Sequence, residues 1–294
     1  MFNGSLVALI TPFDENNQID EQGIKKLVEF HIENGTDGIV PCGTTGESPT
    51  LSHEEHKKVI ELTVKAAGGR VPVVAGTGSN STEEAIDLTS TAKDIGADGV
   101  LLVMPYYNKP TQKGLYMHFK TIVDKVNIPA VVYNVPGRSG VNLLPATLAE
   151  LAELKNIVAV KEASGNLEQM TEIMYLCGKK ITLLSGDDKI LLPVLSIGGK
   201  GVISVVANII PKEVSLMVKE FQGDHFHEAQ DIFMKTIYPL SRAMFYETNP
   251  IPVKTAARLM GLPAGSLRLP MIDMEDNHLR QLKNDLERFG LLEG

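Results

Sequence analysis

The chain has 294 residues, and 43% of them are hydrophobic, so it can bury a sizeable core. The formal net charge of -8, without any basic run, argues against nucleic acid or an anionic membrane as the main partner, and a small molecule is the expected ligand. The two cysteines, Cys42 and Cys177, form no C-x-x-C pair, and there is no histidine cluster. Neither a disulfide framework nor a bound metal is therefore expected.

The N-terminal segment MFNGSLVALITPFDE has no basic leader, and its apolar run soon meets Pro12 and Asp14. It is not typical of a signal peptide. No apolar stretch approaches the roughly 18 residues that a membrane span requires. We expect a cytoplasmic protein in a reducing compartment.

Eight short runs rich in β-branched residues alternate with amphipathic segments along most of the chain. This order predicts βα units whose parallel strands are covered on the outside. The expected strands are LVALI near Leu6, GIVPC near Ile39, VPVVAG near Val73, GVLLVMP near Leu101, PAVVYNV near Val131, IVAVKEA near Val158, ITLLSG near Leu183 and GVISVVA near Ile203.

Helix boundaries are marked between the strands. Glycine follows three expected helices and begins the turn into the next strand, as it commonly does at a helix C-terminus. Serine followed by glutamate three residues later indicates a capping box at two helix starts, and proline begins a third helix. These positions are Gly35, Gly96 and Gly198 for the turns, Ser52 with Glu55 and Ser81 with Glu84 for the boxes, and Pro211 for the proline start.

Eight strands, each followed by a helix, predict an α/β protein folded as a (β/α)8 TIM barrel, with catalytic groups at the C-terminal strand ends. An open doubly wound sheet is the alternative, but the first expected strand–helix turn, ITPFDENNQ, lacks the glycine-rich dinucleotide-binding pattern. We assign residues 1–223 to the catalytic barrel and residues 224–294 to a C-terminal helical appendage. Helices are expected in this appendage around Glu228 to Tyr246, Pro252 to Met260 and Asp276 to Phe289.

Lys161 lies at the end of an apolar run, IVAVKEASG, next to Val160 and Ala159. An amine held among such residues loses solvation of its charged form, so its pKa is expected to fall below the usual value of about 10.4. The neutral amine can then form a Schiff base with a carbonyl substrate. The alternative is a strand-end lysine that simply reaches water. The polar segments after the neighbouring strands favour the Schiff-base lysine over this alternative.

Other strand ends bring polar groups to the same rim. After the second strand, GTTGES offers the hydroxyls of Thr44 and Thr45 and several glycine amides that can surround a carboxylate. After the fifth strand, YNVPGRSG carries Tyr133, which can pass protons, and Arg138, which can hold a carboxylate by two parallel hydrogen bonds. Each feature alone is also typical of a plain turn, a strand tyrosine or a solvated arginine.

Two further strand ends carry weaker signals. After the fourth strand, Tyr106 and Tyr107 are adjacent, so one can line a pocket while the other faces a partner. After the seventh strand, Gly186 permits close approach of another group, and Asp187 and Asp188 are expected to cap the next helix rather than to bind a metal.

The strings GTTGES, PYYNKP, YNVPGRSG and VAVKEASG, in this order, resemble the dihydrodipicolinate synthase family of pyruvate-dependent class I aldolases. The similarity runs from SLVALITP to NPIPVK and LRLP, and so covers essentially the whole chain. It implies that Lys161 forms an imine with pyruvate, and that the resulting enamine attacks L-aspartate 4-semialdehyde before the adduct cyclises. No metal or organic cofactor is implied, because the lysine itself acts as the electron sink.

The resemblance also implies roles for the other residues of these strings. Thr44, Tyr133 and Tyr107 would form a proton relay, with Tyr107 contributed across a dimer interface of a homotetramer. Thr45 would hold the pyruvate carboxylate, and Arg138 would hold the carboxylate of the semialdehyde. The pyruvate side would be lined by Gly186 and by the main chain at Ile203.

Relatives inhibited by lysine hold that effector at the tight-dimer interface, which implies feedback inhibition here. Glu84 would meet the α-amino group of the effector, Asn80 and Tyr106 its carboxylate, and the two histidines its side chain. Pro49 departs from the small residue usual at its position and removes a backbone donor. The alternative is that the histidines are exposed helix residues and that Glu84 is only a cap. The matching positions are Ser48, Pro49, His53, His56, Asn80, Glu84 and Tyr106.

Two other functions remain open. A sister aldolase, such as N-acetylneuraminate lyase or a keto-deoxy sugar acid aldolase, shares the barrel, the lysine and the tyrosine, but has less need of the guanidinium of Arg138. A catalytically silent barrel that senses a keto acid or lysine would be expected to have lost the lysine, the tyrosine or the threonines, and all of these are present.

Overall fold

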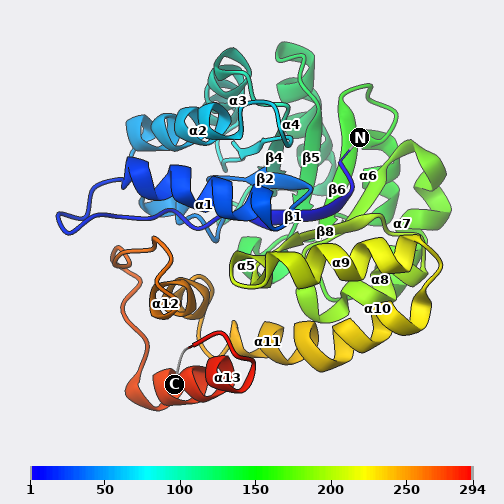
Figure 1. Ribbon diagram of the computed structural model, residues 1–294. Coiled ribbons are helices and arrows are strands. Elements are labelled where there is room, and N and C mark those ends of the chain that lie inside the picture. The colour runs from blue at the N-terminus through cyan, green and yellow to red at the C-terminus, as the bar shows by residue number, and fades with distance from the viewer. Residues whose placement is uncertain (1, 293–294) are drawn as a thin grey trace.

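The computed structural model describes residues 2–292, and its strands and helices alternate along the chain (Figure 1). All eight expected strands are present, and each overlaps its predicted run, with ends that differ by up to three residues. Their bounds are β1 Gly4–Ala8, β2 Gly38–Val40, β3 Val74–Gly76, β4 Gly99–Val103, β5 Ala130–Asn134, β6 Ile157–Glu162, β7 Thr182–Ser185 and β8 Gly201–Ser204.

The strands pair in parallel in the order β2-β1-β8-β7-β6-β5-β4-β3. A further parallel bridge between Ile39 and Val73 joins β2 to β3 and closes the ring. The (β/α)8 barrel is therefore confirmed, and the alternative of an open doubly wound sheet is excluded, because such a sheet keeps two free edges.

The period of two along each strand separates two hydrophobic cores. Side chains that point into the barrel, such as Leu6, Val131 and Ala159, form a small inner cluster. Their alternates, such as Val132 and Val160, pack outward against the surrounding helices in a much larger cluster. The inner cluster is a packed core and not a pore, so a ligand has room only at the ends of the strands.

Helices surround the barrel and are bounded as the sequence indicates, with one correction. Ser52 and Glu55 form a complete capping box at α2, and Pro211 begins α9. At α3, Ser81 accepts from the amide of Glu84, but the Glu84 carboxylate does not return to the cap, so that capping box was wrongly predicted. The bounds are α1 Glu21–Glu33, α2 His53–Ala67, α3 Thr82–Ile95, α4 Gln112–Lys125, α5 Pro136–Ser139, α6 Pro145–Leu151, α7 Leu167–Cys177, α8 Leu191–Ser196 and α9 Pro211–Gln222.

The C-terminal helices gather on one side of the barrel, coloured yellow to red in Figure 1. They are α10 Phe226–Ile232, α11 Tyr238–Ala243, α12 Ile251–Leu259 and α13 Asp276–Arg288, with a π-helical turn, Phe233–Ile237, joining the first two. The three helical segments expected from the sequence are therefore found. The division of the chain at residue 223 stays a prediction.

Within residues 2–292, no helix is both long enough and apolar enough to cross a lipid bilayer.

Candidate active site

Tyr133 and Lys161 meet at the rim of the barrel because of the strand period and the strand register. Val131 and Ala159 point into the barrel, so the residues two positions later, Tyr133 and Lys161, point the same way. The two residues are direct partners in the β5–β6 pairing. The Lys161 Nζ atom lies 4.3 Å from the centroid of the Tyr133 ring. The amine of Lys161 and the ring of Tyr133 therefore lie next to each other, as predicted.

Burial shifts the pKa values of Lys161 and Tyr133 in the directions that Schiff-base chemistry requires. Lys161 is only 6% exposed, and burial lowers its pKa to about 8, with a further decrease from Arg138 and an opposing effect of the Asp188 carboxylate. Burial also raises the pKa of Tyr133 to about 12, although the nearby Arg138 and Thr44 oppose that shift. Near neutral pH, a fraction of the lysine is thus an uncharged nucleophile, while the phenol keeps its proton.

The Thr44–Thr45 turn follows β2 and faces the same rim. Thr45 is buried, and its hydroxyl accepts a hydrogen bond of 3.1 Å from the side-chain amide of Asn249. Thr44 is half-buried, and its carbonyl accepts from the amide of Glu47 at 3.1 Å. Thr44 therefore lines the cavity at the rim, whereas the Thr45 hydroxyl is held by Asn249 from the C-terminal segment.

Arg138 lies on α5, the short helix after β5, and its side chain is exposed at the rim. The guanidinium donates to the backbone carbonyl of Asn249 at 3.1 Å. Asn249 thus contacts both Thr45 and Arg138, the two residues predicted to hold carboxylates. Sequence reasoning missed Asn249, and its only signal was its place in the string NPIPVK, next to a proline in a segment assigned to the appendage.

Gly186 packs against the lysine, and Ile203 lies in the inner cluster of the barrel. A Cβ atom on Gly186 would lie 2.7 Å from Ala163 Cβ and 3.1 Å from Lys161 Cε, so only glycine lets the end of β7 pack against the lysine stem. Ile203 is fully buried on β8 and belongs to the inner cluster. The role of these two residues in lining the pyruvate side stays a prediction.

The two aspartates after β7 differ in what they do. Asp187 caps the following 3-10 turn by accepting from the amide of Lys189, as predicted. Asp188 does not cap that turn, and this part of the prediction was wrong. Its Oδ2 atom instead accepts from the amides of Val205 and Val206 at 2.9 and 3.0 Å, because its buried side chain points across to the end of β8.

Tyr107 is the one predicted relay residue that lies away from the other relay residues within the chain. Its side chain is 90% exposed, and its backbone has a φ of 71°, which is unusual for a residue with a side chain. Tyr106, by contrast, lines the cavity described next. The adjacent tyrosines thus lie in different surroundings, and the contact of Tyr107 with a partner subunit stays a prediction.

A cavity of about 430 Å³ extends from the site to the surface between α2 and α3. Glu84 is held there by the His53 ring, whose Nε2 atom lies 2.7 Å from Glu84 Oε1, and by a hydrogen bond from Ser79. Asn80 is not among the lining residues, and its amide donates to the carbonyl of Tyr106 at 3.2 Å. Of the predicted effector positions, the cavity is lined by Ser48, Pro49, His53, His56, Glu84 and Tyr106, and it also reaches Thr44 and Arg138.

His56 is fixed by the backbone, and its pKa is lowered. Its Nε2 atom lies 2.6 Å from the carbonyl oxygen of Gly76, so this nitrogen carries the proton and donates. Burial lowers the pKa of His56, although the Gly76 contact opposes that shift. A neutral His56 therefore offers the cavity a polar group without a charge, whereas His53 is paired with Glu84.

Within residues 2–292, no group of three or more histidine, cysteine, aspartate or glutamate side chains is placed to hold a metal ion.

Comparison with known proteins agrees with this geometry. Residues 1–289 match the model of the dihydrodipicolinate synthetase family. A curated relative from Geotalea uraniireducens, named 4-hydroxy-tetrahydrodipicolinate synthase, is 56% identical over 292 residues, which cover 99% of this chain and 100% of the relative.

Two solved structures are similar over nearly their whole length. The chloride-inhibited dihydrodipicolinate synthase from Acinetobacter baumannii, complexed with pyruvate, is 44% identical with a TM-score of 0.97, and the alignment covers 99% of this chain and 100% of that one. The enzyme from Cyanidioschyzon merolae, with lysine bound, is 42% identical with a TM-score of 0.96, and the alignment covers 99% of each chain. The chain therefore belongs to the dihydrodipicolinate synthetase family.

Proposed function

We propose that this protein is a 4-hydroxy-tetrahydrodipicolinate synthase, a lyase of the class I aldolase type that condenses pyruvate with L-aspartate 4-semialdehyde in the diaminopimelate route to lysine. The observation that carries the proposal is a buried amine, Lys161, in register with a buried phenol, Tyr133, at the C-terminal rim of the barrel. The name of the Geotalea uraniireducens relative and the pyruvate in the Acinetobacter baumannii structure support the same activity.

The chemistry begins with the neutral amine of Lys161, which attacks the carbonyl carbon of pyruvate. Water leaves, and a Schiff base forms. Loss of a proton from the methyl group gives an enamine, whose carbon attacks the aldehyde carbon of the second substrate. The amino group of the adduct then displaces the lysine amine from the imine carbon, which closes the ring and frees the enzyme.

Proton transfers and carboxylate binding fall to the surrounding residues. We assign the proton relay to Thr44, Tyr133 and Tyr107 of a partner subunit. Thr45, with its neighbouring amides, holds the pyruvate carboxylate, and Arg138 holds the carboxylate of the semialdehyde. The lowered pKa of Lys161 and the raised pKa of Tyr133 support this division, because one group must lose a proton readily and the other must keep it available. Gly186 and the main chain at Ile203 line the pyruvate side.

Feedback inhibition by lysine is part of the proposal. The cavity between α2 and α3 offers the acidic Glu84 for an ammonium group and is connected to Thr44 and Arg138. The Cyanidioschyzon merolae structure carries lysine, which supports an effector of this kind. We infer a homotetramer built as a dimer of tight dimers, and a cytoplasmic location in keeping with amino-acid biosynthesis.

A coupled assay tests the function directly. Purified protein is given pyruvate and L-aspartate 4-semialdehyde, with and without lysine, and borohydride is used in parallel to trap the pyruvate adduct on Lys161. We expect turnover without added metal, activity that withstands a chelator, and inhibition by lysine. Productive turnover with pyruvate and N-acetylmannosamine in place of the semialdehyde would instead identify a sister aldolase. Trapping without any turnover would identify a sensor.

A further inference from the structure

A buried ion pair lies directly behind the Thr44–Thr45 turn. Lys254, on α12, is 1% exposed, and its ammonium donates to Glu47 Oε1 at 2.5 Å and to the carbonyl of Ser266 at 2.7 Å. The same ammonium lies 4.0 Å from the centroid of the Phe13 ring. Glu47 itself is 3% exposed. A buried pair of charges stabilises a fold little compared with well-packed apolar residues, so its presence calls for an explanation beyond stability.

The backbone of Glu47 indicates what the pair holds. Glu47 has φ 55° and ψ 33°, a left-handed conformation that costs free energy for any residue with a side chain. Its amide donates to the carbonyl of Thr44 at 3.1 Å, and the preceding residue, Gly46, accepts at 2.6 Å from the Thr11 hydroxyl. The residue with the strained backbone, Glu47, is therefore also the residue whose carboxylate Lys254 binds.

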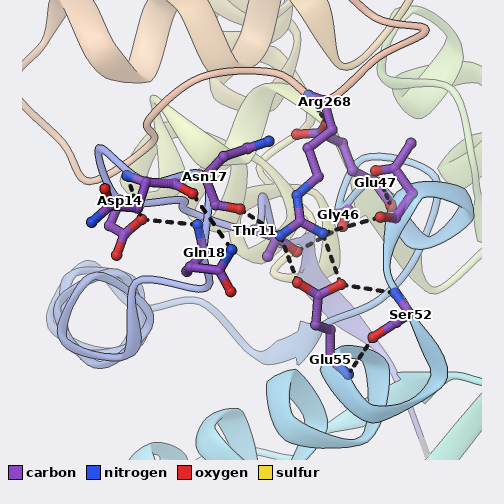
Figure 2. A network of polar contacts seen from close by, with 11 residues as sticks. Thr11, Asp14, Asn17, Gln18, Gly46, Glu47, Ser52, Glu55 and Arg268 are labelled. Carbon is purple, nitrogen blue, oxygen red and sulfur yellow. Dashed lines mark hydrogen bonds and ion pairs between the residues drawn. The ribbon is translucent and has the colours of Figure 1, made fainter.

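The second carboxylate oxygen of Glu47 is held from the same part of the chain. It accepts from the backbone amide of Arg268 at 3.1 Å. The Arg268 guanidinium then forms two hydrogen bonds with Glu55, at 2.8 and 2.6 Å, and another with the carbonyl of Thr50 at 3.0 Å. Figure 2 shows this network, with Arg268 reaching from the C-terminal segment to both Glu47 and Glu55. Both ends of segment 47–55 are thus fixed by residues that lie more than 200 positions later.

We propose that Lys254 and Glu47 are positioning residues, whose buried ion pair holds the Thr44–Thr45 turn in its substrate-binding conformation from the C-terminal helices. The proposal rests on the proposed function for the identity of the bound substrate, pyruvate. The competing explanation is that the pair only attaches α12 to the barrel. The two explanations differ in what they predict for the turn when the protein stays folded.

Two variants and one control separate these explanations. Lys254→Met removes the ammonium, and the double variant Glu47→Gln/Lys254→Met removes both charges, so that no unpaired charge stays buried. Tyr246→Phe is the control, because it removes a 2.6 Å hydrogen bond between Tyr246 and Asp285 within the C-terminal helices without touching the turn. Melting temperatures report on the attachment of the C-terminal helices in all three proteins.

Hydrogen exchange gives a readout that does not depend on activity. The amides of Glu47, Ser48, Thr50 and Leu51 are all hydrogen-bonded within the turn and the short helix after it. In both variants we expect exchange of these amides to be about tenfold faster or more, while the strands of the barrel exchange as before. We expect no such change in Tyr246→Phe.

Kinetics give the second readout. Misplacement of a substrate-binding group by an ångström costs up to about a hundredfold in rate, so we expect the KM for pyruvate to rise about tenfold or more in both variants. The KM for the semialdehyde should change less, because Arg138 is held by the Asn249 backbone and not through Glu47. Tyr246→Phe should leave both values unchanged.

The outcomes are distinct. Unchanged exchange in the turn of a folded double variant overturns the proposal, and so does an unchanged KM for pyruvate. A lower melting temperature, with neither faster exchange in the turn nor a higher KM for pyruvate, shows that the pair only attaches α12. If borohydride fails to trap pyruvate on the unmodified protein, the proposed function falls, and the exchange experiment alone then decides whether the pair positions the turn.

Discussion

At the scale of single residues, the site depends on the charge state of Lys161. Burial lowers the pKa of this amine to about 8, and the protonated form cannot attack a carbonyl. The rate of imine formation should therefore rise as pH increases through about 8 and level off above it. The measurement is the initial rate of the borohydride-trapped pyruvate adduct, by mass spectrometry, from about pH 6 to about pH 10.

The control for that profile is Lys161→Arg, which stays charged at every pH in this range and should give no adduct. A profile that rises only near the ordinary lysine value of about 10.4 would contradict the assignment, because it would mean that burial does not lower the pKa.

Tyr133 is predicted to act after the imine has formed. Its pKa is raised to about 12 by burial, so the phenol is protonated at neutral pH and can give up and regain a proton in the relay. Tyr133→Phe should lower kcat by about 10²–10⁴-fold, the usual contribution of a positioned acid–base group. The borohydride-trapped adduct should still form, since the lysine is intact. Loss of the adduct in a folded Tyr133→Phe protein would place the phenol in imine formation itself.

At the scale of elements, the start of α2 carries a charged network that responds to acid. Hydrogen bonds from Arg268 lower the pKa of Glu55 from 4.5 to about 2, with a further decrease from the Ser52 backbone. Because the folded pKa is below the unfolded one, the stabilisation is fully present above about pH 4.5 and is lost as pH falls towards about 2.

The test of this network is Glu55→Gln. Near neutral pH the variant should lose about 1 kcal/mol in free energy of unfolding, the value typical of a well-formed but partly exposed pair. The difference from the unmodified protein should shrink in denaturant titrations at successively lower pH. Glu54→Gln, a neighbour on the exposed face, is the matched control and should show no pH-dependent difference. A constant difference across pH would mean that hydrogen-bond geometry, and not charge, accounts for the loss.

Elements and single residues differ in how far the sequence predicts them. The eight strands follow from apolar runs bounded by glycine and proline, which are local signals. Local reasoning failed for Glu84 because its carboxylate has better partners in His53 and Ser79 than in its own helix start. It failed for Asp188 because the amides that it accepts from are on another strand end.

Motif spacing could not predict contacts between residues that are far apart in the sequence. Asn249 is separated from Thr45 by 204 positions and from Arg138 by 111. Lys254 is similarly distant from Glu47, its partner in the buried pair. Nothing in a single sequence indicates which of many strand ends a C-terminal side chain will meet, so these residues required the structure.

At the scale of the whole molecule, the proposed assembly of two subunits depends on where Tyr107 lies in its own chain. Residues 106–109 form a tight turn at the surface, in which Tyr107 and Lys109 both have positive φ, and Asn108 donates to the carbonyl of Asn80 at 2.9 Å. Such strained positions persist only when their surroundings fix them. The turn therefore presents Tyr107 outward, with its ring 90% exposed, as the proposed role in the site of a second subunit requires.

A two-fold dimer makes a specific prediction from this arrangement. In an isologous interface, each subunit supplies Tyr107 to the site of the other. A Tyr107→Phe subunit keeps its own Tyr133, and a Tyr133→Phe subunit keeps its own Tyr107. A mixed dimer of the two variants therefore has one site that contains both tyrosines and one that contains neither.

Subunit mixing tests this arrangement without any knowledge of the interface. Each variant alone should have strongly reduced kcat. After dissociation and random reassociation of equal amounts, half of the dimers are mixed and one of their two sites is intact, so activity should recover to about a quarter of that of the unmodified protein. Native mass spectrometry of differently labelled subunits measures the mixed fraction, and activity should follow it in proportion. Mixed dimers without recovered activity would show that Tyr107 serves its own chain or none, because only a tyrosine supplied across the interface can complement the missing one.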